Sequence, residues 1–350
     1  MLIRLISGDR PRSRVLTALL LAVLIALLAA PFLLPGTRPL NVAAKVAVFI
    51  VLVASYDLLL GYTGIVSFAH TMFFGIGGYG VGIAAAKWGT GWGALAAGVA
   101  LAVLLSVVLA LVIGLLSLRV RAIFFAMITL AVASFFQILA SQWSAFTGGE
   151  DGINFKLPAA LSPGNRLLEE PLWGADITGR TLTYGVVLGA LVLFLLLLRI
   201  VNSPFGRVLQ AIRENEFRAE ALGYRTVVYR SVANGIAAVG AAAAGVLYAL
   251  WLRYTGPATT LSFDIMIDIL LMAVIGGMGT LYGAVLGAAI FVVAQNYLQD
   301  LMKLASDAFE GWPLLPALLH PDRWLLWLGV LFIVCVYYFP NGIVGKLRRN

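Results

Sequence analysis

The stretch RIVNSPFGRVLQAIRENEFRAEALGYRTVVYR, residues 199–230, is a polar island in a chain that is otherwise strongly apolar. It carries six basic residues and three glutamates, and it lies between two long apolar runs. Ser203 is a good N-cap residue, Pro204 suits the first helical position, and Gly223 suits the stop. These signals predict a short helix over 202–223 that lies outside the bilayer, between two membrane spans.

One face of this predicted helix is apolar and the opposite face is charged. Phe205, Val208, Leu209 and Ile212 recur at helical spacing, whereas arginines and glutamates occupy the rest of the surface. A helix outside the membrane has no lipid to cover an apolar stripe. We therefore expect the stripe to dock onto another protein.

Composition places the rest of the chain in a membrane. Of its 350 residues, 61% are hydrophobic and only 11% are charged, and the mean hydropathy is +0.98. A soluble domain cannot bury that much apolar surface, so membrane lipids are expected to surround the chain. The net charge of +8 does not indicate nucleic acid, because basic residues gather in the cytoplasmic loops of membrane proteins. The single cysteine, Cys335, excludes an intrachain disulfide.

The sequence predicts an all-α integral membrane protein with about ten transmembrane helices, in a range of eight to ten, within a single domain over 1–350. A span needs about 20 apolar residues, or fewer where glycine interrupts it. The first segment follows several arginines, as a signal peptide would, but it is long enough to be an uncleaved span. The third, eighth and ninth segments are short or glycine-rich. The expected spans are 15–35, 42–60, 65–86, 92–117, 122–142, 181–200, 232–252, 264–279, 281–298 and 323–340.

The distribution of Lys and Arg predicts how these spans are oriented. With ten spans and a cytoplasmic N-terminus, most basic residues fall in segments inside the cell, among them Arg119, Arg121 and those of 199–230. Both termini and the 202–223 helix are then cytoplasmic. The loop at 143–180 is then external, where we expect it to form a cap or docking surface without a strand pattern.

A weak internal sequence similarity, which we call the internal echo, indicates that the five spans of the first half are repeated in the second half. Val66-Ser67-Phe68 followed by Gly77-Gly78 is similar to Leu261-Ser262-Phe263 followed by Gly276-Gly277. Five spans repeated in tandem would give two halves of opposite topology. The similarity also fits chance, because the whole chain is rich in Gly, Ala and Leu.

Glycines and polar groups are dense in two stretches that are expected to lie within the membrane, around 61–80 and 275–280. Irregular backbone is tolerated there only where protein or a water-filled cavity covers it. Broken helices would expose helix ends that can hold a substrate carboxylate or amine, whereas the alternative is close helix packing through small residues. The glycines in question are Gly61, Gly64, Gly77, Gly78, Gly276, Gly277 and Gly279.

Four polar residues in the expected spans are candidates for a substrate path: Ser67, His70, Gln137 and Asp268. Ser67 and His70 are equally well explained by hydrogen bonds to neighbouring carbonyls, and Gln137 by an interhelical bond. A carboxylate within a span usually faces a cavity or a partner, which keeps Asp268 as a path candidate. Asp264 is most simply an acid in the first turn of a helix.

The motifs of catalysis are absent from the sequence. It contains no Walker A loop, no HExxH or CxxC pair and no GxSxG elbow. We therefore expect neither an enzyme nor a bound metal or cofactor, and any ATP must be hydrolysed by another chain.

Several motifs together resemble one family. They are the run 61–80, TGGEDGI at 147–153, NSPFGRVLQAIRENEFRAEALGY at 202–224, GGMGTLYGAVLGA at 276–288 and FPNGIVG at 339–345. In this order they are similar to permease subunits of ATP-binding-cassette importers, in particular branched-chain amino acid permeases of the LivM type. Urea and short-chain amide permeases have similar motifs.

The resemblance implies an importer in the bacterial inner membrane, built from this permease, a sister permease, two cytoplasmic ATPases that bind the ATP, and a periplasmic binding protein. It also implies that 202–223 is the coupling helix that docks into the ATPase, with Ser203, Phe205, Leu209, Ile212, Glu216, Glu220 and Gly223 as candidate contacts. In the family the glutamate lies six residues before the glycine. Here Glu216 lies seven before Gly223 and Glu220 three before it, which leaves the contacting residues open.

Two other hypotheses remain at this point. A secondary transporter would be driven by an ion bound near Asp268 or His70, and would transport without any ATPase. A membrane scaffold would have little use for two glycine-rich breaks. Substrate identity is not encoded in any motif, because an apolar pocket for Leu, Ile or Val can form almost anywhere in this chain.

Overall fold

A computed structural model describes residues 13–33, 38–117, 122–162, 181–308 and 319–349. Each of the ten expected spans contains one helix. Eight helical segments among the described residues are long and apolar enough to cross a bilayer, and 14–29 is a shorter apolar one. The all-α membrane fold is therefore confirmed. The ten helices are α2 (Arg14–Leu33), α3 (Arg38–Thr63), α4 (His70–Lys87), α5 (Trp92–Ser117), α6 (Ala122–Gln142), α8 (Thr181–Val201), α11 (Thr226–Leu252), α13 (Phe263–Gly276), α14 (Leu281–Ala308) and α16 (Trp324–Tyr338).

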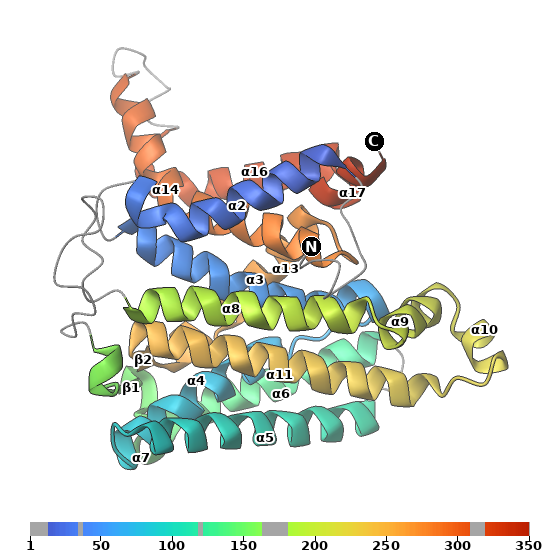
Figure 1. Ribbon diagram of the computed structural model, residues 1–350, viewed down its shortest axis with the longest axis horizontal. Coiled ribbons are helices and arrows are strands. Elements are labelled where there is room, and N and C mark those ends of the chain that lie inside the picture. Colours follow the sequence, from blue (N-terminus) through green and yellow to red (C-terminus); the bar gives the residue numbers. More distant parts are fainter. Residues whose placement is uncertain (1–12, 34–37, 118–121, 163–180, 309–318, 350) are drawn as a thin grey trace.

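Short elements gather at the two ends of the bundle (Figure 1). We call one end the α10 end. It carries α9 (Pro204–Glu214), α10 (Glu216–Ala221) and α17 (Gly342–Arg349). The opposite end, the α7 end, carries α7 (Ser144–Thr147), η1 (Gly149–Asp151), β1 (Ile153–Asn154) and β2 (Tyr254–Thr255). The remaining short elements are η2 (Ala159–Leu161), α12 (Pro257–Thr260) and η3 (Pro321–Arg323).

The loop that begins at 143 contains a strand that its sequence does not suggest. β1 pairs antiparallel with β2, so that Ile153 lies opposite Thr255. Gly152, just before β1, has φ +67, and a Cβ there would meet the carbonyl of Thr255. The glycines of TGGEDGI thus let the loop lie directly on the chain that follows α11. Residues 163–180 of the same predicted loop lie outside the described residues, as do the arginines of 1–12 and 118–121.

α3 is the central helix of the bundle, and its apolar side chains are buried on all sides. α11 packs along both α3 and α4. A Cβ at Gly77 of α4 would overlap the carbonyl of Ala242 on α11, and a Cβ at Gly245 of α11 would overlap the carbonyl of Phe74. Helices approach this closely only through residues without side chains. Gly77 and Gly78 therefore lie inside a continuous helix, and the prediction of a break there is wrong.

The two halves of the chain make corresponding contacts. α4 packs on α11, and α13 packs on α3. α5 packs on α4 and α11, while α14 packs on α13 and α3. Exchanging each of these six helices for its counterpart five spans away reproduces the contacts just given, as a five-plus-five repeat requires, whereas the packing of α3 on α8 has no equally close counterpart between α11 and α2. The inverted repeat itself stays a prediction.

Candidate functional site

Two short helices begin inside the bundle, and non-helical backbone leads to each. α3 ends at Thr63 and α4 begins only at His70, while α12 ends at Thr260 and α13 begins at Phe263. In Figure 1, α4 lies towards the α7 end and α13 towards the α10 end. The rings of Phe68 and Phe263 have centroids 6.1 Å apart. The residues of the internal echo thus meet where both helices start.

Two serines of the echo make the same local hydrogen bond. Ser67 Oγ accepts from the backbone N–H of Ala69 at 3.3 Å, and Ser262 Oγ accepts from that of Asp264 at 3.1 Å. Each serine satisfies one of the N–H groups that a helix start leaves open. Asp264 is an acid in the first turn of α13, as the sequence predicts. Ser67 is buried and lies two residues before the N-cap of α4, so its bond satisfies the N–H of the cap residue Ala69.

A polar cluster joins three helices one turn further along α13. The ammonium of Lys45 on α3 donates to Gln295 Oε1 on α14 at 2.9 Å. The amide of Gln295 donates in turn to Asp268 Oδ2 on α13 at 3.5 Å. All three side chains are half-buried. Charges of opposite sign therefore face one another within the membrane spans, which is the usual condition for keeping such charges there.

The other predicted path residues lie elsewhere. His70 is fully buried, with Nε2 3.2 Å from Ser55 Oγ and its ring centroid 5.0 Å from that of Tyr56. Gln137 is half-buried on α6. Neither lies in the cluster of Asp268, and His70 has the surroundings of a core residue. In the part of the chain that the structure describes, no group of His, Cys, Asp and Glu side chains is placed to hold a metal ion.

A second break, between α13 and α14, is held by a buried carboxylate. Gly277 and Gly279 have φ +109 and +85 there, and Gly64 has φ +73 after α3. Gly61 and Gly276 lie within helices instead. Asp57 on α3, almost fully buried, accepts from the N–H of Gly279 at 2.9 Å. The carboxylate thereby fixes the end of α3 to the break.

The helix predicted over 202–223 is two helices. α9 ends at Glu214, and Asn215 takes an extended conformation with φ −158. The Asn215 side chain then caps α10 by accepting from the N–H of Arg218 at 2.9 Å. An asparagine side chain can hydrogen-bond a nearby backbone N–H group in this way, which competes with continuation of the helix. Gly223 has φ +92 and follows α10, in agreement with its predicted role as the stop.

The apolar stripe of α9 faces the chain's own bundle. Leu209 and Ile212 are 0% and 1% exposed, and the ring of Phe205 stacks on that of Tyr229 at 5.7 Å. α9 packs on α3, α8 and α11. The expectation that this stripe awaits a protein partner is therefore wrong. Ser203 occupies the cap position, but its hydroxyl donates to the carbonyl of Ile200 at 2.6 Å.

Two of the three glutamates of the island, Glu216 and Glu220, face α11 rather than a partner. Arg230 forms an ion pair with Glu216 at 2.5 Å, and the hydroxyl of Thr226 donates to Glu220 at 2.8 Å. Both bonds hold α10 against the start of α11. The most exposed apolar side chains of the α9–α10 segment are Phe217 and Leu222, which are 86% and 72% exposed. The helical pattern could not identify them, because Phe217 lies in α10 and Leu222 directly after it, outside the stripe of α9.

The structure also contains a link between α9 and the breaks that no sequence pattern predicts. The guanidinium of Arg213, on α9, donates to the carbonyl of Gly61 on α3. A Cβ at Gly61 would overlap both Asp57 and the N–H of Gly279. Arg213, Gly61, Asp57 and Gly279 therefore form one continuous set of contacts from α9 to the second break. The residues are far apart in sequence, so spacing gives no signal for them.

Comparisons with known proteins point to the same class of protein. Residues 38–336 match the family model described as branched-chain amino acid transport system / permease component. The chain is 26% identical to the high-affinity branched-chain amino acid transport system permease protein LivM of Salmonella typhimurium and to that of Escherichia coli, in each case over 94% of this chain and 75% of the relative. It is 31% identical to the probable branched-chain amino acid transport permease protein LivM of Methanocaldococcus jannaschii, over 49% of this chain and 48% of that protein.

No solved structure matches the chain. The family match nevertheless covers most of it, from the start of α3 to the last turn of α16. It includes both breaks, the Lys45–Gln295–Asp268 cluster and the α9–α10 segment. The chain therefore belongs to the family of branched-chain amino acid transport system permease components.

Proposed function

We propose that this chain is the permease subunit of an ATP-driven importer of branched-chain amino acids in the bacterial inner membrane. It would work with two ATPases, a sister permease and a periplasmic binding protein. The observation that carries the proposal is α10, a short helix that projects from the bundle (Figure 1) with Phe217 and Leu222 exposed. Two such apolar side chains, one on a helix outside the membrane and one at its C-cap, fit a surface that another protein covers.

In this proposal α10 docks on the ATPase and α9 passes the movement into the bundle. α10 is tied to α11 by the bonds of Glu216 and Glu220. α9 is buried among α3, α8 and α11, and Arg213 binds the end of α3. The contacts of Gly61 and Asp57 then extend to Gly279. A displacement of α10 by an ATPase would reach the α13–α14 break through packed, hydrogen-bonded groups.

This assignment sets the orientation of the chain. The α10 end lies in the cytoplasm with α17 and the start of α2, and the α7 end lies in the periplasm. The prediction from the basic residues supports the same orientation. The loop with α7, η1 and β1 is then available to the binding protein.

The Lys45–Gln295–Asp268 cluster supports an amino acid as the substrate. An amino acid is a zwitterion, with one carboxylate and one ammonium group, and the cluster supplies one side chain of each sign within the spans. A neutral amide such as urea needs neither charge. The exposed side chains of Phe263 and Asp264, beside the cluster on α13, lie on a face that the sister permease would cover.

Uptake into membrane vesicles tests the proposal. Radiolabelled leucine should enter only when the ATPases, the sister permease and the binding protein are supplied together with ATP. Excess isoleucine and valine should compete, whereas urea and acetamide should not. Uptake by this chain alone that stops when an ion gradient is collapsed would instead establish a secondary transporter. A cysteine at Phe217 should form a cross-link to the ATPase in the complete complex.

A further inference from the structure

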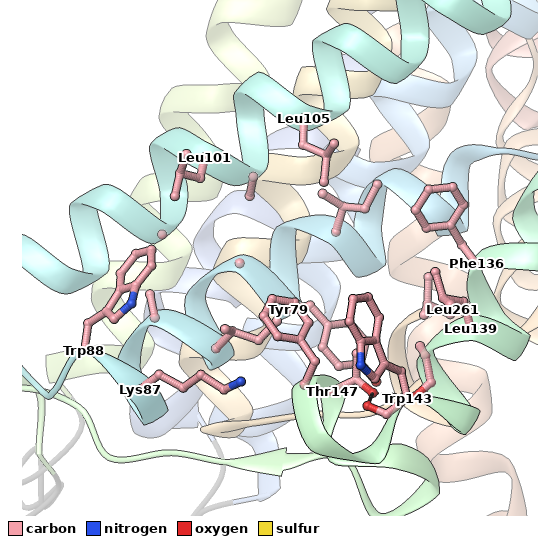
Figure 2. A pocket seen from close by; sticks show the side chains of 18 residues that line it. Tyr79, Lys87, Trp88, Leu101, Leu105, Phe136, Leu139, Trp143, Thr147 and Leu261 are labelled. Carbon is pink, nitrogen blue, oxygen red and sulfur yellow. Dashed lines mark hydrogen bonds between the residues drawn. The ribbon is translucent and has the colours of Figure 1, made fainter.

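A groove of about 350 Å³ runs between α4, α5 and α6 at the α7 end (Figure 2). Its walls are almost entirely apolar, with Leu101 and Leu105 on α5 facing Phe136 and Leu139 on α6. Leu101 and Leu105 are about half exposed, so the groove opens onto the surface of the bundle. α5 and α6 bury little of their length inside the chain, and in a bilayer this surface meets lipid.

One end of the groove is cationic and aromatic. Lys87, at the last turn of α4, points its ammonium towards α7 (Figure 2). The ammonium lies 3.3 Å from the carbonyl of Ala145 and 4.4 Å from the ring centroid of Phe146. No carboxylate in the described part of the chain pairs with it within 4.0 Å. Trp88 and Trp143 flank the same end, as tryptophans do at a membrane–water interface.

A further polar group lines the groove. Tyr79 is 7% exposed, and its hydroxyl has no hydrogen-bond partner among the described residues. A buried hydroxyl without a partner costs free energy that a bound ligand oxygen would recover. The groove thus offers an apolar channel and an unneutralised cation, beside a tyrosine whose hydroxyl has no hydrogen-bond partner among the described residues.

We propose that this groove binds an anionic phospholipid. One acyl chain lies against Leu101, Leu105 and Phe136, and the phosphate lies at the ammonium of Lys87 between the two tryptophans. The lipid fills the space between α6 and the α4–α5 pair. An apolar segment of the sister permease would cover the leucines but would leave the cation without a counter-charge, so charge complementarity favours the lipid.

Lipid counting by mass spectrometry tests the proposal on the complete complex, reconstituted in nanodiscs with equal amounts of phosphatidylglycerol and phosphatidylcholine. The wild-type complex should retain phosphatidylglycerol in preference to phosphatidylcholine. Lys87→Gln should reduce that preference about fivefold, the change expected for one basic residue near an anionic lipid. Lys303→Gln is the matched control. Lys303 is an exposed lysine near the C-terminal end of α14, and it does not line the groove.

A second variant tests the apolar channel separately. Leu105→Trp fills the groove without changing charge and, at a half-exposed position, leaves the fold intact. It should lower the number of retained lipids of both kinds. An unchanged lipid preference in Lys87→Gln would overturn the proposal. A cross-link from Leu105→Cys to the sister permease in the intact complex would also overturn it, because the groove would then hold protein.

Discussion

The rings of Phe68 and Phe263 lie with their centroids 6.1 Å apart and their planes tilted by 45°. One ring precedes α4 and the other begins α13, so the contact joins the starts of two short helices that run from the middle of the bundle to opposite ends. Phe263 is also exposed, at the first position of α13 and directly before Asp264. In transporters, sites for substrate lie where such discontinuous helices begin.

We expect the two rings to act as one constriction beside the path. Phe68→Ala and Phe263→Ala should each change the rate of leucine uptake by a similar factor, and the double variant should change it little further. In thermal unfolding the pair should show a coupling free energy of about 0.5–1.5 kcal/mol. Tyr337→Ala, which removes one ring of an exposed pair on α16, should leave uptake unchanged. Independent, additive effects of the two phenylalanines would contradict the prediction.

The Lys45–Gln295–Asp268 cluster allows a structural role to be separated from a role in transport. Asp268→Asn alone leaves Lys45 without a counter-charge in the spans and should lower both stability, by about 1–3 kcal/mol, and uptake. The double variant Lys45→Met with Asp268→Asn removes both charges and should restore stability but not uptake. The readouts are the thermal unfolding of the purified complex and leucine uptake.

Asp264→Asn is the control for this pair. Asp264 lies one turn away on the same helix face but is exposed. Its substitution should have little effect on stability. Recovery of uptake in the double variant would show that the charges only hold the three helices together.

The two surfaces of the α9–α10 segment should respond differently to a charge. Leu209→Asp places a carboxylate in a fully buried position, which costs several kcal/mol, so the variant should fail to give monodisperse permease. Phe217→Asp alters a side chain that is 86% exposed. It should leave the permease folded and weaken ATPase binding by roughly 30-fold, as for loss of a contact worth about 2 kcal/mol. Size-exclusion chromatography and pull-down of the ATPase measure the two effects.

Features that depend on a few consecutive residues could be predicted from the sequence. The spans follow from runs of apolar residues. Gly223 has the positive φ of a helix stop, and Asp264 lies in the first turn of α13, as predicted. The interruption of the predicted helix at Asn215 is local too. Several residues in this stretch are chemically reasonable caps, however, and the helical spacing of apolar residues continues across Asn215. An amphipathic pattern shows that a helix has an apolar face without showing what covers it.

Contacts between distant residues were beyond prediction from one sequence. The residues next to Lys45 and Asp268 in the sequence give no sign of the cluster, and only the packing of α3, α13 and α14 brings the two side chains together. The same holds for Arg213 and Gly61, and for Asp57 and Gly279. Glycine by itself does not separate the two alternatives either, because it allows both a break, as at Gly64, Gly277 and Gly279, and a close helix crossing, as at Gly77.

Two glycines of α11 test the close crossing directly. A Cβ at Gly245 would overlap the carbonyl of Phe74 on α4, whereas nothing lies within 4 Å of a Cβ at Gly235. Gly245→Ala should therefore force α4 and α11 apart and destabilise the complex by about 1–3 kcal/mol. Gly235→Ala should stabilise it by about 0.5–1 kcal/mol, because alanine loses less conformational freedom in a helix.

Both variants replace glycine by alanine in the same helix, so the difference between their stabilities reports the close crossing of α4 and α11. The melting temperature of the purified complex should fall for Gly245→Ala and stay level or rise for Gly235→Ala. Uptake should fall with the first variant, because α4 begins beside Phe68 and cannot shift without moving that ring. Equal melting temperatures for the two variants would show that α4 and α11 do not approach as closely as these glycines allow.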